Sequence, residues 1–213
     1  MILFAISTFP SSSFPSGRFI AMRRINPNWL TASRMVVFAP LALGLLCLDT
    51  QLSLALCLVV MLLAELTDAL DGILARATGQ VTDLGKIFDP LCDSVYHGLV
   101  WMGFVAAGWM PAYVAAIFLF RDQIVAYIRV YLAQKQFIMA ARWSGKVKAV
   151  SQAIAQIAIV VMHISLPDSE ISRTIQICLI GVAAAITAYS LVDYFRGGLL
   201  QRADIAVHFK TAA

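Results

Sequence analysis

Six long apolar stretches follow one another along the 213-residue chain, and short connections containing polar residues, Gly or Pro separate them. A helix needs about 20 mostly apolar residues to cross the hydrocarbon core of a bilayer. The alternating pattern typical of strands is not found. The fold class is therefore predicted to be all-α, a polytopic membrane protein with about six transmembrane helices. The predicted spans are residues 31–48, 52–76, 89–109, 111–132, 147–166 and 171–195.

Composition agrees with this prediction. Hydrophobic residues make up 61% of the chain and charged residues only 13%, whereas soluble domains carry about 25% charged residues. The formal net charge is +4. In a chain this apolar, a basic excess indicates contact with anionic lipid headgroups and not with nucleic acid.

The basic residues are distributed unevenly among the connections. They gather before the first span, between the second and third, between the fourth and fifth, and after the last. By the positive-inside rule both termini are predicted to be cytoplasmic. The predicted organisation is an N-terminal extension at 1–24, a membrane domain at 25–196 and a cytoplasmic C-terminal tail at 197–213. Pro10 and Pro15 favour a disordered extension, with a targeting segment as the alternative.

Four aspartates stand out at the ends of two neighbouring spans. Asp68 and Asp71 are three residues apart, and Asp89 and Asp93 are four apart. At about 100° per residue, each pair shares one face of its helix. The short link between the two spans makes the helices antiparallel neighbours. The four carboxylates are therefore predicted to converge on one cavity at the membrane boundary.

Four negative charges in a low-dielectric setting require a cation. Oxygen ligands without His or Cys favour Mg²⁺, Mn²⁺ or Ca²⁺ over zinc or copper, and paired metals suit displacement at phosphorus. We expect Mg²⁺ or Mn²⁺, two ions per site. The alternative is that these acids are solvated residues at the membrane edge.

The same stretch resembles the signature of the CDP-alcohol phosphatidyltransferase family, D-x2-D-G-x2-A-R-x8-G-x3-D-x3-D, with every spacing met. The resemblance implies a six-helix membrane fold, usually homodimeric, with a site open to the cytoplasm. It implies that Asp68, Asp71 and Asp89 are metal ligands, and that Asp93 is partly a ligand and mainly the general base. The residues implied to hold the nucleotide of the donor are Gly72, Ala75, Arg76 and Gly85.

Further segments resemble the subgroup of bacterial phosphatidylglycerophosphate synthases. Pro27-Asn28, Leu30-Thr31 and Arg34 match the P-N-x-L-T-x2-R entry of that subgroup. Its R-E, later R and G-K-x-K-T-x2-Q segments are similar to Arg121-Asp122, Arg129, Gly145-Lys146, Lys148 and Gln152. Asp122 replaces a usual Glu, Ala149 a usual Thr and Ser94 a frequent Lys. These departures leave the reaction intact and leave the acceptor open.

Four basic residues are candidates for binding the phosphate of the acceptor: Arg121, Arg129, Lys146 and Lys148. A bare guanidinium within a span is costly. Asp122 points about 100° away from Arg121 on the helix and is expected to be an imperfect partner. The alternatives are that Arg121 pairs with a signature aspartate, that Lys146 and Lys148 are cytoplasmic anchors, and that Arg129 extends to the membrane surface.

The leading functional hypothesis is transfer of a phosphatidyl group from CDP-diacylglycerol to sn-glycerol 3-phosphate, with release of CMP. The same chemistry with inositol phosphate, phosphatidylglycerol or serine is the first alternative. A membrane ion transporter with a carboxylate relay and a non-catalytic scaffold are the others. Expected partners are the two substrates, membrane lipid and a second copy of the chain. The expected location is a membrane of the bacterial inner-membrane type, with the active site facing the cytoplasm.

Overall fold

The computed structural model describes residues 31–78, 83–134, 142–167 and 169–211, and the side chains in these ranges except those of residues 71–88, 133–134 and 198–211. Every regular element in these ranges is helical, which confirms the all-α prediction, and most of each predicted span lies on helix, although α4 ends at Ala106, before the predicted end of the third span. In chain order the elements are the π-helix η3 (Arg34–Phe38) and the α-helices α2 (Ala39–Leu48), α3 (Gln51–Thr78), α4 (Asp83–Ala106), α5 (Ala112–Gln134), α6 (Trp143–Ser165) and α7 (Glu170–Thr211).

Four helical segments within the described residues are long and apolar enough to cross a membrane. They are Thr31–Leu48, Gln51–Leu70, Trp143–Ser165 and Glu170–Gly197. The remaining two predicted spans lie on α4 and α5, whose charged residues lower their mean apolarity. These charged residues include Asp89 and Asp93 on α4 and Arg121, Asp122 and Arg129 on α5.

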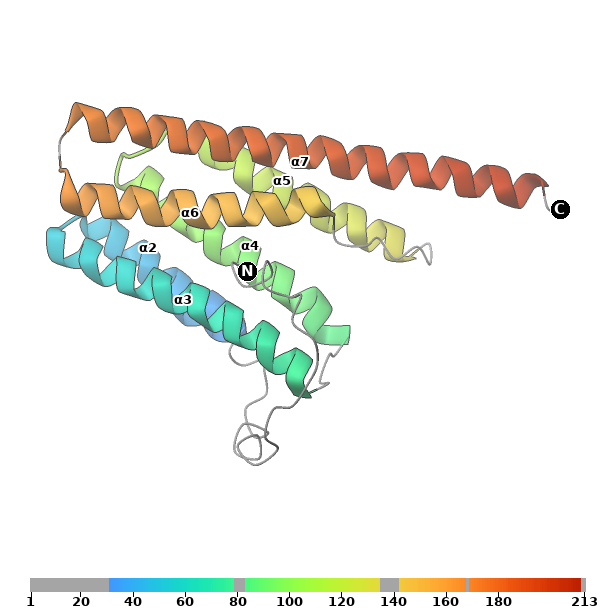
Figure 1. The fold of residues 1–213 in the computed structure, drawn as a ribbon, viewed down its shortest axis with the longest axis horizontal. Coiled ribbons are helices and arrows are strands. Elements are labelled where there is room, and N and C mark those ends of the chain that lie inside the picture. The colour runs from blue at the N-terminus through green and yellow to red at the C-terminus, as the bar shows by residue number, and fades with distance from the viewer. Residues whose placement is uncertain (1–30, 79–82, 135–141, 168, 212–213) are drawn as a thin grey trace, which may run out of the picture. The chain divides into compact units, whose positions relative to one another are not determined.

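The chain divides into two compact units, Met1–Trp109 and Met110–Ala213. In the first unit, η3 and α2 pack against both α3 and α4 (Figure 1). The helices approach closely where Gly103 of α4 meets Leu46 of α2. A Cβ atom on residue 103 would lie 2.5 Å from Leu46 Cδ1. A small residue is therefore needed at this crossing, as is common between membrane helices.

The turn between α2 and α3 is set by local hydrogen bonds. Asp49 ends α2 in the left-handed conformation, with φ of 45°. Thr50 then caps α3: its backbone N–H donates to Ser53 Oγ at 2.9 Å, and the Ser53 N–H donates to Thr50 Oγ1 at 3.2 Å. These reciprocal bonds satisfy donors that a helix start leaves unpaired. Asp49 and Thr50, the two residues between α2 and α3, therefore form a tight turn between the helices.

Helix α4 ends in a Schellman motif. Gly108 has φ of 74°, its N–H donates to the Val105 carbonyl at 3.0 Å, and the Trp109 N–H donates to the Phe104 carbonyl at 2.8 Å. The rings of Phe104 and Trp109 are 5.2 Å apart and supply the apolar contact that accompanies this motif. Glycine is favoured at residue 108 because a side chain is strained at positive φ.

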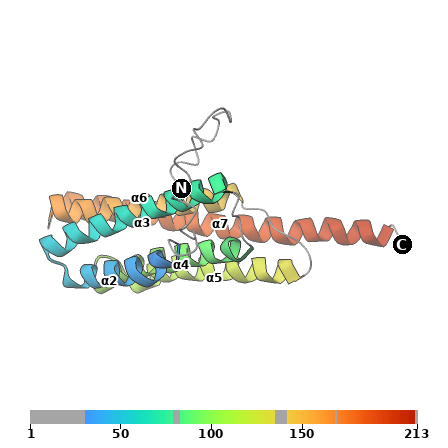
Figure 2. The same cartoon turned by 90° about the horizontal axis from the view of Figure 1, so that it is seen from below.

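In the second unit, α7 packs against both α6 and α5, and Figure 2 shows α6 running beside α7. Part of the core of this unit is polar, since Gln152 and Gln156 of α6 and Thr187 and Ser190 of α7 are buried. Large apolar side chains such as Phe120 and Ile177 are exposed instead. Polar residues inside and apolar residues outside are the arrangement expected of a protein surrounded by lipid.

Candidate active site

Two signature aspartates of the first unit meet at one arginine. Arg34 Nη1 lies 2.6 Å from Asp68 Oδ1 on α3 and 2.5 Å from Asp93 Oδ1 on α4. The Arg34 side chain is only 4% exposed. Arg34 belongs to a segment that matches the bacterial subgroup, and no role was predicted for it. The structure shows that it brings carboxylates from two helices to a single point.

Proline explains the local shape of the helix that carries Arg34. The N–H of Ala39 donates to the Arg34 carbonyl, five residues back, and Pro40 follows directly. Proline has no N–H to donate, and its ring clashes with the carbonyl four residues earlier. The wider π-helical turn is a way of accommodating this proline, and such turns often occur at functional sites.

Asp89 belongs to the same electrostatic neighbourhood. It forms a hydrogen bond with the Thr31 hydroxyl, and its charge interacts with those of Arg34 and Asp68. Asp93 in turn interacts with both Asp68 and Asp89. Among the described side chains, these three carboxylates carry negative charge and Arg34 offsets part of it, while Asp89 is exposed. Carboxylate oxygens are the hard donors that a divalent cation of the Mg²⁺ class prefers.

The rest of the signature lies where the structure describes no side chains. Asp71, Gly72, Ala75 and Arg76 lie on α3 and Gly85 lies on α4, all within residues 71–88. Among the described residues, no group of three or more His, Cys, Asp or Glu side chains forms a metal-binding cluster. The predicted four-aspartate set includes Asp71 and so extends outside the described side chains.

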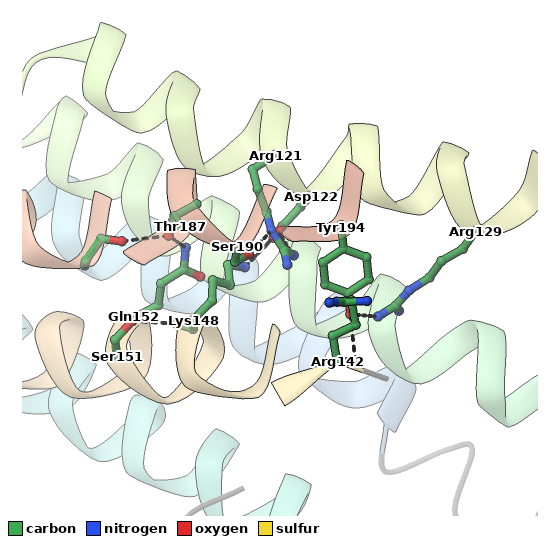
Figure 3. Close-up of polar contacts among 11 residues, drawn as sticks. Arg121, Asp122, Arg129, Arg142, Lys148, Ser151, Gln152, Thr187, Ser190 and Tyr194 are labelled. Atoms are coloured by element: carbon green, nitrogen blue, oxygen red, sulfur yellow. Dashed lines mark hydrogen bonds and ion pairs between the residues drawn. The ribbon is translucent and has the colours of Figure 1, made fainter. Parts of the chain in front are cut away.

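In the second unit, Asp122 binds two buried cations. Lys148 Nζ lies 2.8 Å from each carboxylate oxygen of Asp122, and Arg121 Nη1 lies 3.0 Å from Asp122 Oδ1 (Figure 3). The expectation that Asp122 is an imperfect partner for Arg121 is wrong. The guanidinium stands at the end of a long flexible side chain, so the angle between adjacent residues on a helix does not prevent the contact. Arg121 Nε also donates to Ser190 Oγ at 2.8 Å.

Tyr194 lies beside two of the predicted phosphate-binding arginines. Arg129 Nη2 donates to Tyr194 Oη at 2.6 Å. The guanidinium carbons of Arg121 and Arg129 lie 5.2 and 5.3 Å from the centre of the Tyr194 ring. In Figure 3 the side chains of both arginines extend from α5 toward this ring on α7. Both distances are typical of cation–π contacts.

The residue before Tyr194 ties the start of α6 to α7. Asp193 accepts hydrogen bonds from Arg142 Nε and Nη2 at 2.6 and 2.7 Å, and from Ser144 Oγ at 2.5 Å. The two-pronged arginine contact fixes orientation as well as distance. Arg142, Asp193 and Tyr194 were not among the predicted site residues. The signal available for them was an acid, Asp193, within an apolar span.

Two glycines make these contacts possible. A Cβ atom on residue 145 would lie 2.8 Å from Tyr194 Oη and 3.2 Å from its Cε2 atom. A Cβ atom on Gly197 would overlap the guanidinium of Arg142. The glycine of the G-K-x-K segment is therefore explained by the close approach of Tyr194.

Lys146 has a different environment from Lys148. Its Nζ atom lies 5.9 Å from the centre of the Trp143 ring, which is exposed. A lysine beside an exposed aromatic ring is typical of the interface between membrane and water. This position agrees with the anchor alternative for Lys146, and its phosphate-binding role stays a prediction.

Comparison with known proteins identifies the family. A sequence profile described as CDP-alcohol phosphatidyltransferase matches residues 24–191, which is more than half of the chain. A protein of Sodalis glossinidius named CDP-diacylglycerol–glycerol-3-phosphate 3-phosphatidyltransferase is 32% identical over 172 residues, covering 79% of this chain and 91% of that protein. Proteins with the same name are 30% identical in Yersinia pestis, with the same coverage, and 28% identical in Mycoplasma genitalium, covering 68% of this chain and 69% of that protein. The chain belongs to the CDP-alcohol phosphatidyltransferase family.

Proposed function

We propose that this protein transfers a phosphatidyl group from CDP-diacylglycerol to sn-glycerol 3-phosphate and releases CMP, as the names of its relatives describe for them. The proposal rests mainly on one observation, the excess positive charge of a cluster in the second unit, of which Arg121 and Lys148 are buried. Arg121, Arg129 and Lys148 carry three positive charges, and Asp122 carries one negative charge. A phosphorylated acceptor offers the missing negative charge, whereas an uncharged alcohol does not.

Unsatisfied hydrogen-bond donors support the same proposal. Arg121 Nη2 and Arg129 Nε are buried and have no hydrogen-bond partner among the described residues. A buried donor without a partner is costly, and a guanidinium nitrogen is more costly than a neutral group. Phosphate oxygens are well suited to accept from such donors. The two arginines therefore present both charge and free N–H groups to an anion.

In the proposed reaction Asp93 is the general base. Its carboxylate accepts the proton of the acceptor hydroxyl, and that oxygen attacks the phosphorus atom that carries diacylglycerol. A new oxygen–phosphorus bond forms while the bond from this phosphorus to the bridging oxygen breaks. CMP leaves with the bonding electron pair. Arg34 orients Asp93 through the 2.5 Å contact.

We assign Asp68, Asp71, Asp89 and Asp93 as the residues that hold divalent metal, Mg²⁺ or Mn²⁺, with two ions per site. When bound, the metal neutralises the pyrophosphate of the donor and the charge of the leaving CMP. Gly72, Ala75, Arg76 and Gly85 are proposed to bind the nucleotide. The metal assignment is supported by the negative charge that Asp68, Asp89 and Asp93 share among the described side chains.

The chain is an integral membrane protein, with four apolar helical segments of membrane-spanning length. We propose that α4 and α5 cross the membrane as well, giving six spans with both termini and the active site on the cytoplasmic side. The basic residues of the connections support this orientation. We also propose that the protein is a homodimer, as is usual in the family it resembles.

The test is an assay of CMP release by the purified full-length chain with CDP-diacylglycerol and Mg²⁺. Glycerol 3-phosphate, inositol phosphate, phosphatidylglycerol and serine are supplied in separate reactions. We expect CMP with glycerol 3-phosphate. CMP with another acceptor and none with glycerol 3-phosphate would overturn the acceptor assignment alone. Absence of CMP in every reaction would overturn the proposed activity.

A further inference from the structure

We infer that Tyr194 is a positioning residue for the acceptor: it holds Arg121 and Arg129 in the orientation that binds the phosphate group. The inference rests on the proposed function and concerns a residue to which the family signature gives no role. Tyr194 is 1% exposed and lies on α7, whereas both arginines lie on α5. It acts through the arginines and is not itself a catalytic residue.

The Tyr194 ring keeps two guanidinium groups close together although they repel each other. They carry like charges, and both lie within 5.3 Å of the Tyr194 ring centre. The negative face of the ring attracts each cation. The hydroxyl group adds a charge-assisted hydrogen bond from Arg129. Tyr194 thus offsets part of the repulsion between the two arginines. A bound phosphate would reduce this repulsion further.

Tyr194 is itself held in place by the start of α6. The backbone N–H of Arg142 donates to Tyr194 Oη at 3.4 Å, and Gly145 leaves the space that the phenol ring occupies. Asp193 anchors the same segment through Arg142 and Ser144. The start of α6 therefore fixes the hydroxyl group, and the hydroxyl group fixes Arg129. Such support is what keeps a binding group in a productive orientation.

The test compares Tyr194→Phe with the wild-type chain. Phenylalanine keeps the ring and removes the acceptor of the Arg129 hydrogen bond. We expect the KM for glycerol 3-phosphate to rise about tenfold, the scale of one hydrogen bond to a charged group. The KM for CDP-diacylglycerol and kcat should stay within about twofold, since neither depends on the arginine pair. Tyr189→Phe, on an exposed tyrosine of the same helix, is the matched control and should change nothing.

A second variant separates positioning from general stability. Arg129→Lys keeps the charge and loses the planar donors. If Tyr194 acts through Arg129, a chain that carries both Tyr194→Phe and Arg129→Lys should bind acceptor no more weakly than Arg129→Lys alone. Additive effects of the two substitutions would overturn the inference. So would an unchanged acceptor KM in Tyr194→Phe, or an equal rise in both KM values.

Inorganic phosphate provides a readout that does not depend on the acceptor assignment. We expect phosphate to raise the thermal unfolding midpoint of the wild-type chain, and to raise that of Tyr194→Phe less at the same concentration. Equal increases in both proteins would overturn the inference. If glycerol 3-phosphate is not a substrate but phosphate stabilises the two proteins unequally, the proposed acceptor is wrong and the role of Tyr194 stands.

Discussion

Arg34 and Asp93 are 59 residues apart in the sequence, and their side chains are joined by a 2.5 Å hydrogen bond. The same Arg34 nitrogen contacts Asp68 at 2.6 Å. One arginine of the first apolar segment thus organises two acids from the two helices that carry the family signature.

Arg34→Gln should destabilise the protein most when divalent metal is removed. The substitution leaves Asp68 and Asp93 without the cation that both contact. We expect a loss of about 1.5 kcal/mol in the free energy of unfolding, the lower end of the range for hydrogen bonds to charged groups, because the Asp68 and Asp93 side chains are partly exposed. The measurement is thermal unfolding in detergent, with chelator or with Mg²⁺. Arg173→Gln, on an exposed residue, is the control, and equal losses in chelator and Mg²⁺ would contradict the prediction.

Asp93→Asn should abolish most of the activity without unfolding the chain. Asparagine has nearly the same shape and cannot accept a proton from the acceptor hydroxyl. We expect kcat to fall about 10²- to 10⁴-fold, the range for loss of a general base. CMP release measures the effect. Asp49→Asn makes the same chemical change at an exposed residue whose left-handed conformation asparagine tolerates, and it should leave kcat unchanged. Full activity of Asp93→Asn would remove the assigned base.

Removal of divalent metal should stop CMP release, and Mg²⁺ or Mn²⁺ should restore it. The reason is that, among the described side chains, Arg34 offsets only part of the negative charge of Asp68, Asp89 and Asp93. Asp68→Asn removes the negative charge of one proposed metal ligand. We expect the Mg²⁺ concentration for half-maximal activity to rise at least about tenfold. Loss of residues that only support a metal ligand can already weaken metal binding by this factor. Activity that persists in excess chelator would contradict the metal assignment.

Gly145→Ala should weaken acceptor binding by moving Tyr194. The added methyl group would stand 2.8 Å from Tyr194 Oη, so the ring must shift and its hydrogen bond with Arg129 is disturbed. We expect the KM for glycerol 3-phosphate to rise at least about fivefold, which corresponds to a lost interaction of about 1 kcal/mol. Gly181→Ala is the control, because nothing lies within 4 Å of a Cβ atom at residue 181 on α7. An unchanged acceptor KM in Gly145→Ala would show that the ring can move without consequence.

Asp122→Ala should be among the most destabilising substitutions in the second unit. It leaves Arg121 and Lys148 buried without their shared carboxylate. Breaking a buried ion pair by removing one partner costs about 3–5 kcal/mol. Adding Lys148→Met should recover part of the loss, because it removes one of the two uncompensated charges. Chemical or thermal unfolding of both variants measures this, and a double variant less stable than Asp122→Ala would refute the explanation.

The sequence predicted the helices well and their polar contacts poorly. Most of each predicted span lies on helix because a run of apolar residues has to satisfy its backbone hydrogen bonds internally in lipid. Spacing also suggested that acids from two spans converge, and Asp68 and Asp93 do meet at Arg34. The partner of Arg121 was mispredicted because helix angles ignore the length of its side chain.

What the sequence determined by itself is chiefly local: apolar length, helical spacing, and a signature of acids and small residues that identifies the family. Only the tertiary structure decided which charged groups share an environment. Arg34 reaches two other helices, and Tyr194 gathers arginines from α5 against a segment of α6. These contacts depend on how helices pack and where a glycine permits close approach, which no periodicity along one helix encodes. The physical reason is that a buried charge is stabilised by whatever lies next to it in space, and that neighbour is set by packing.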